Sequence, residues 1–261
     1  MEGPGTVCPD VNKRLADIYA KFGVWVGIVA AEYTDWGNFT KESKIMSAEL
    51  NPSLIAHSNR GGIVKLHFHP SNPKGGNQHG PPVTWAELCD PGETHDHYMH
   101  VLNATVAGLR ELREHGVVVL WQPYHGRDSD GFWWAMRGAS AMAQSDYKQM
   151  WAHMVDYFNK AGLDNVLYVQ DWYYGGRWGD IKQLYVGDAL VDIVSYDSMA
   201  GTDGIGVPQL YPWEYDNLLS FGKPVGISEN YPYAPDNYTP GDMYAQIVDI
   251  RKRAPRIVYT R

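Results

Sequence analysis

Residues 93–126 read ETHDHYMHVLNATVAGLRELREHGVVVLWQPYHG. In the first part of this stretch, Leu102, Val106 and Leu109 recur three or four residues apart, which is the spacing of one apolar face of a helix. Gly116 follows as a helix C-cap, because glycine adopts the left-handed conformation that ends many helices. The apolar run 117–123 comes next. A helix that leads directly into a buried strand predicts one repeat of a parallel sheet covered by helices.

The same alternation continues along the chain. It predicts an α/β fold, a (β/α)8 TIM barrel, in one domain spanning residues 1–261, and the length of 261 residues suits such a barrel. The expected strands lie at 24–31, 62–68, 117–123, 166–171, 191–197, 223–229 and 256–259, and the expected helices at 10–22, 41–59, 93–115, 140–161, 212–221 and 241–252.

Composition and charge limit the classes of partner. The net charge is −8, which argues against nucleic acid because phosphate binding needs clustered Lys and Arg. No apolar run approaches the roughly 18 residues that span a membrane, and residues 1–5 lack the basic and apolar regions of a signal peptide. Cys8 and Cys89 are the only cysteines, so a disulfide framework is excluded and one bridge between them stays open.

Aromatic residues point to a different class of ligand. The chain has 10 Trp and 18 Tyr but only 6 Phe, so most of its rings carry a polar atom. Such rings stack on the C–H faces of sugars while their polar atoms bind hydroxyl groups. An aromatic-rich core explains the composition equally well, so composition alone does not decide between the two.

Two stretches place polar groups where apolar strands end. KPVGISE at 223–229 ends on Glu229, and a carboxylate at such a position is either held by hydrogen-bond donors, as in a loop cap, or used as a nucleophile in a partly enclosed site. WQPYHG at 121–126 continues into an aromatic loop that contains Trp133 and Trp134. In barrels of this type, the active site lies at the carboxyl ends of the strands.

Taken together, these stretches resemble glycoside hydrolase family 26. WQPYHG followed by FWW is similar to the family's fourth strand and its loop, and KPVGISE to the seventh strand. The resemblance runs in order from about residue 10 to residue 259. Further matches are HFHPSNP at 67–73, LCDPG at 88–92, YVGD at 185–188 and VDIVSYD at 191–197.

The resemblance implies a retaining β-glycosidase of clan A. Most members cleave β-1,4-mannan, and some cleave β-1,3-xylan or mixed β-glucan. It implies that Glu229 is the nucleophile and that a β-linked polysaccharide or oligosaccharide is the substrate. It further implies a monomer that is secreted as the full-length protein and whose first strand and final helix lie outside this chain. The residues expected to bind the sugar are His69, His125, Asp197, Trp134 and Trp133.

No cofactor and no metal are expected. His67 and His69 could share one face of a strand, but no third ligand follows at close spacing.

One position departs from the family in a way that bears on the chemistry. The acid/base Glu is expected directly after His125, where this chain has Gly126. Four interpretations stay open: Asp128 or Asp130 supplies the acid, the protein binds glycans without cleaving them, the glycine is an engineered or sporadic substitution, or Glu229 is merely structural. Three further departures, which favour divergence over a single replacement, are Gln122 for Arg, Gly131 for Trp and Met199 for Tyr.

Overall fold

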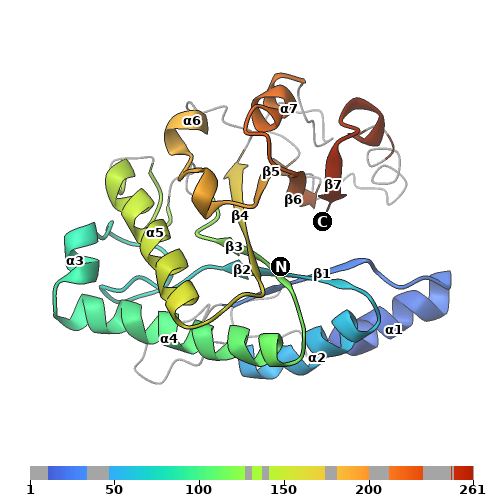
Figure 1. The fold of residues 1–261 in the computed structure, drawn as a ribbon, viewed down its shortest axis with the longest axis horizontal. Coiled ribbons are helices and arrows are strands. Elements are labelled where there is room, and N and C mark those ends of the chain that lie inside the picture. Colours follow the sequence, from blue (N-terminus) through green and yellow to red (C-terminus); the bar gives the residue numbers. More distant parts are fainter. Residues whose placement is uncertain are drawn as a thin grey trace. The chain divides into compact units, whose positions relative to one another are not determined.

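The computed structural model describes residues 11–33, 47–126, 131–136, 141–173, 181–199, 212–231, 248 and 250–260. The chain forms two compact units. The first unit consists of Met1–Tyr124 and Ser129–Leu167, and the second of His125–Asp128 and Tyr168–Arg261. Among the described residues, seven strands alternate with helices along the chain (Figure 1).

Three parallel strands form the sheet of the first unit. Strand β2 is buried from its second residue onward, as expected for a parallel strand covered on both faces. Helix α2 packs against α4 and against β1 and β2, and the long α4 lies beside it in Figure 1. The elements are α1 (Val11–Phe22), β1 (Ile28–Glu32), α2 (Ser47–Asn59), β2 (Ile63–Phe68), α3 (Trp85–Cys89), α4 (Glu93–Glu114), β3 (Val119–Pro123) and α5 (Gln144–Lys160).

The sheet of the second unit is also parallel, with β5 between β4 and β6, and β7 beside β6. Gly226 in β6 makes room for a ring from the next strand, because a Cβ atom there would lie 2.3 Å from Cζ of Tyr259. The elements are β4 (Val166–Tyr173, counted in this unit from Tyr168), α6 (Ile181–Leu184), the short 3-10 helix η2 (Asp188–Leu190), β5 (Ile193–Met199), α7 (Pro212–Leu219), β6 (Val225–Tyr231) and β7 (Ile257–Thr260).

Every expected strand is confirmed, with small differences at the ends. The strand expected at 24–31 begins at Ile28 and ends at Glu32, since Val24 and Trp25 are exposed. Helix α3 was not expected, although Thr84 and Glu87 form a capping box at its start. The helix expected at 241–252 lies mostly outside the described residues, of which 248 and 250–253 are helical. Among the described helices, none combines the length and the hydropathy of a membrane span.

Candidate active site

The carboxyl ends of β4, β5 and β6 bring polar residues together in the second unit. Asp197 in β5 is the register partner of Tyr173 in β4 and of Glu229 in β6. The register shifts between Tyr196 and Asp197, and irregularities of this kind re-aim side chains next to active sites. Because the strands are parallel, their carboxyl ends share one edge of the sheet, so Asp197 and Glu229 lie at neighbouring positions of that edge.

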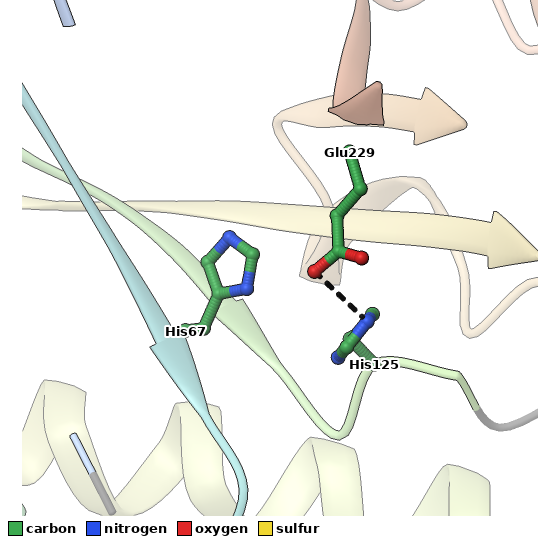
Figure 2. Close-up of side chains that lie close together, drawn as sticks. All are labelled: His67, His125 and Glu229. Atoms are coloured by element: carbon green, nitrogen blue, oxygen red, sulfur yellow. Dashed lines mark ion pairs between the residues drawn. The ribbon is translucent and has the colours of Figure 1, made fainter. Parts of the chain in front are cut away.

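His125 lies between these two carboxylates. Its Nε2 atom is 3.4 Å from Oε1 of Glu229 and 3.6 Å from Oδ2 of Asp197, and Figure 2 shows the imidazole pointing toward the Glu229 carboxylate. The Asp197 side chain is fully buried, whereas that of Glu229 keeps 17% of its surface exposed. The Glu229 carboxylate is therefore the one of the two that solvent or a ligand can reach.

Gly126 follows His125 and has backbone geometry that favours glycine. Its φ angle is 70°, in the left-handed region that side chains with a Cβ atom rarely adopt. Its backbone N–H donates to Oδ2 of Asp171 at 3.4 Å, and Asp171 is fully buried. Position 126 thus contributes a backbone donor to the second unit and no carboxyl group. The other acids considered for this role, Asp128 and Asp130, lie outside the described residues.

Further buried polar groups lie in the same strands, before their carboxyl ends. Asp171 is the register partner of Ser195, two residues before the pair of Tyr173 and Asp197. The Ser228 hydroxyl donates to that of Ser195. Burial raises the pKa of Tyr259 to about 12, and the charges of Asp197 and Asp171 act in the same direction. Hydrogen bonds to Ser228 and Ser195 lower this pKa but do not offset the effect of burial. Tyr259 is therefore a neutral phenol at neutral pH.

The carboxyl ends of β1 and β2 form a second cluster, which belongs to the first unit. Nδ1 of His69 lies 2.7 Å from Oε2 of Glu32, and Nδ1 of His67 lies 3.4 Å from Oε1. Glu32 and His67 are register partners. A carboxylate at Nδ1 favours the tautomer that carries the proton there, which leaves Nε2 of His69 as an acceptor. Only 3% of the His69 side chain is exposed, so its contact with a sugar hydroxyl stays a prediction.

Trp133 and Trp134, both expected to bind sugar, are fully buried. The Trp133 indole N–H donates to the Pro70 carbonyl at 2.9 Å, which is the environment of a core residue. The Trp134 ring stacks on Phe132 at 4.6 Å with an interplanar angle of 5°, and its centroid lies 5.9 Å from that of His69. Phe132 is the less buried ring of the stack, whereas the fully buried Trp134 has no exposed surface for a sugar. The roles of both tryptophans stay predictions.

The structure also places in these clusters several residues for which no role was predicted. Glu32 follows directly after the expected strand 24–31, and Asp171 is the last residue of the expected strand 166–171. Both are acids at carboxyl ends of strands, the same signal that singled out Glu229. Ser195, Ser228 and Tyr259 carry no comparable signal, because single hydroxyl groups inside strands are common.

The chain is similar to proteins of known activity. The family model for Glycosyl hydrolase family 26 matches residues 9–211. A mannan endo-1,4-beta-mannosidase from Bacillus subtilis is 30% identical over 219 residues, which make up 80% of this chain and 58% of that protein. Mannan endo-1,4-beta-mannosidase A and B from Caldalkalibacillus mannanilyticus is 27% identical over 249 residues, covering 91% of this chain and 47% of that protein. The chain therefore spans about half the length of these curated relatives.

Solved structures share the fold. The mannanase BCman from Bacillus subtilis has a TM-score of 0.77 at 22% identity, over 95% of this chain and 74% of that one. A ruminal endo-beta-1,4-mannanase has a TM-score of 0.73 at 16% identity, over 99% of this chain and 56% of that one. Together with the parallel strands and intervening helices, this likeness confirms the expected fold class, a TIM barrel of the clan A type.

Proposed function

The chain belongs to glycosyl hydrolase family 26, and on this premise we propose that it is a retaining endo-β-glycosidase that acts on β-linked hemicellulose, most of all on β-1,4-mannan. The observation that carries the proposal is the partly exposed Glu229 carboxylate, with Nε2 of His125 at 3.4 Å and Asp197 in register beside it. The names of the curated relatives support mannan as the substrate.

In this proposal Glu229 is the nucleophile. One of its carboxylate oxygens attacks the anomeric carbon while the bond to the leaving oxygen breaks, which gives a glycosyl ester on Glu229. Water then attacks the same carbon and releases Glu229 and the sugar with retained configuration. His125 holds the attacking carboxylate through the 3.4 Å contact. Asp197 lies 3.6 Å from the same nitrogen and orients the imidazole.

A second candidate function is supported by Gly126. Non-catalytic binding of glycans on the same scaffold fits a chain that has no carboxyl group directly after His125 and whose backbone there adopts a φ angle of 70°. In that case, the clusters around His125 and His69 would bind sugar hydroxyls without bond cleavage. Both functions include the binding of sugars, so only turnover of a substrate distinguishes them.

A paired assay tests the proposal. The chain is incubated with 2,4-dinitrophenyl β-mannoside, whose leaving group needs no proton, and separately with mannan. We expect release of dinitrophenol above the rate of the Glu229→Gln variant. Binding of manno-oligosaccharides without any release of dinitrophenol would favour the non-catalytic function. Secretion of the full-length protein and a monomeric state are proposed on the family resemblance alone.

A further inference from the structure

We propose that Asp171 is the acid/base residue of this chain and that it takes over proton transfer from the carboxyl group missing at position 126. This inference rests on the proposed glycosidase function. In this proposal the second carboxyl group of the reaction comes from strand β4 and not from the loop after β3.

The first argument is the contact between the two positions. Oδ2 of Asp171 accepts a hydrogen bond from the backbone N–H of Gly126 at 3.4 Å. The family's acid would project from the backbone of residue 126, and Asp171 brings a carboxylate to that same backbone from the neighbouring strand.

The second argument is that Asp171 and Glu229 converge on one dipeptide. Residue 125 contacts Glu229 through its imidazole at 3.4 Å, and residue 126 contacts Asp171 through its amide. A retaining glycosidase needs two carboxyl groups on opposite sides of one glycosidic bond. Because β4 and β6 flank β5, the two acids come from opposite sides of the strand that carries Asp197.

Asp171 lies deeper than Glu229. In register it belongs with Ser195, two residues before the pair formed by Tyr173 and Asp197. Two residues of a strand span about 6.6 Å. The Asp171 side chain is fully buried, so the proton travels to the glycosidic oxygen across one water molecule that enters between them. Tyr259 of β7 is a titratable group that interacts with both Asp171 and Asp197 of β5 among the described residues of this unit.

The reaction balances as follows. In the first step Asp171 gives its proton to the leaving oxygen while Glu229 forms the glycosyl ester, so the negative charge of Glu229 moves to Asp171. In the second step Asp171 takes a proton from water, the water oxygen bonds to the anomeric carbon, and Glu229 leaves as a carboxylate. The pair carries one negative charge throughout, and no oxidant, metal or cofactor is needed.

The test compares leaving groups. Asp171→Asn keeps an acceptor for the Gly126 amide but cannot transfer a proton. We expect kcat/KM of this variant on phenyl β-mannoside to be about 10²–10⁴-fold lower than that of the parent chain. Its kcat/KM on 2,4-dinitrophenyl β-mannoside should change less than about 10-fold, because kcat/KM reports formation of the glycosyl ester, which needs no acid with this leaving group. In Asp171→Ala, added azide should restore turnover and yield β-mannosyl azide, because azide attacks the glycosyl ester without a base.

Asp192→Asn is the matched control, since Asp192 also accepts a backbone N–H, that of Tyr168 at 2.8 Å. We expect it to keep the rates of the parent chain on both substrates. If Asp171→Asn does not fold, Asp171→Glu must retain the rate on phenyl β-mannoside to within about 10-fold for the proposal to stand.

Three outcomes would overturn the assignment. Equal losses of kcat/KM on both substrates in Asp171→Asn would give Asp171 a positioning role only, and unchanged kcat/KM values on both would give it none. Azide that fails to form a β-mannosyl product would exclude the base role. A parent chain that is inactive even on the dinitrophenyl substrate would instead refute the proposed function itself, so the two failures can be told apart.

Discussion

Nε2 of His125 lies 3.4 Å from Oε1 of Glu229 and 3.6 Å from Oδ2 of Asp197, so one imidazole contacts both carboxylates at the carboxyl ends of β5 and β6. The fully buried Asp197 can fix the orientation of the ring, and the ring in turn fixes the more exposed Glu229. Such preorganisation lowers the cost of bringing a nucleophile into line with its target. The predictions below start from this arrangement.

Glu229→Gln should lower the rate on 2,4-dinitrophenyl β-mannoside by about 10³-fold or more, because the amide cannot form the glycosyl ester. Steady-state release of dinitrophenol measures the effect. Glu114→Gln, at the exposed end of α4, is the control and should leave the rate unchanged. A Glu229→Gln variant with the full rate would show that this carboxylate takes no part in the chemistry.

His125→Ala should lower kcat on the same substrate by about 10²-fold, because a loss of orientation near the reacting atoms has a cost of this order. The thermal midpoint should change little, since the imidazole keeps some exposed surface. The kinetic loss should be larger than any loss in folding stability. Should kcat stay unchanged in a folded His125→Ala, the His125 contact would have no catalytic value.

Gly126→Ala should lower the free energy of unfolding by about 1–2 kcal/mol, because alanine is strained at a φ angle of 70°. Urea denaturation measures this loss, and Gly116→Ala, at a φ angle of 73°, should lose a similar amount. For the same reason Gly126→Glu should not by itself restore hydrolysis of phenyl β-mannoside. Stabilisation by Gly126→Ala would instead mean that the residue has ordinary backbone angles.

His97 should make stability depend on pH. Burial lowers its pKa from 6.5 to about 4, with His100 acting in the same direction and a hydrogen bond to the Pro73 carbonyl opposing it. Between pH 6.5 and 4 the unfolded chain binds a proton that the folded chain does not, so this contribution to stability is complete above pH 6.5 and is lost as the pH falls toward 4. The loss should be on the order of 2 kcal/mol, below the full conversion of the shift, because His97 lines a surface cleft with Pro73 and Lys74, where solvent screens its charge.

Denaturation of His97→Asn across this pH range tests the assignment. The variant should show a shallower slope between pH 6.5 and 4 than the parent chain, and part of the slope should remain because burial also lowers the pKa values of His57 and His153. His115→Asn, which replaces an exposed histidine just after α4, should keep the full slope. An unchanged slope in His97→Asn would assign the pH dependence to other groups.

Most of the fold could be predicted from the sequence because buried parallel strands are short apolar runs between amphipathic helices. The run 117–123 and strand β3 (Val119–Pro123) agree to within two residues. Helix α3 was missed because its five residues are too few to show helical periodicity. The start of β1 was misplaced because the apolar residues Val24 and Trp25 are exposed, and apolar character alone does not distinguish surface from core.

The candidate site could be predicted only in part. The position of Glu229 after an apolar strand indicated its location, but its contact with His125 joins residues that are distant in sequence. The same holds for Gly126 and Asp171, which are 45 residues apart. Sequence spacing is informative within a helix or strand, whereas these contacts depend on strand register. The single-domain organisation, the roles of His69, Trp133 and Trp134, and a bond between Cys8 and Cys89 stay predictions, and Cys8 lies outside the described residues.

The most direct test of the central claim is to trap the glycosyl ester. The chain is incubated with 2-deoxy-2-fluoro-β-mannosyl fluoride, whose fluoride leaves without a proton, and its peptides are analysed by mass spectrometry. We predict that one fluorosugar is attached to Glu229 and that Glu229→Gln is not labelled. A label on another residue, or no label on a chain that binds manno-oligosaccharides, would contradict the claim that Glu229 is the nucleophile.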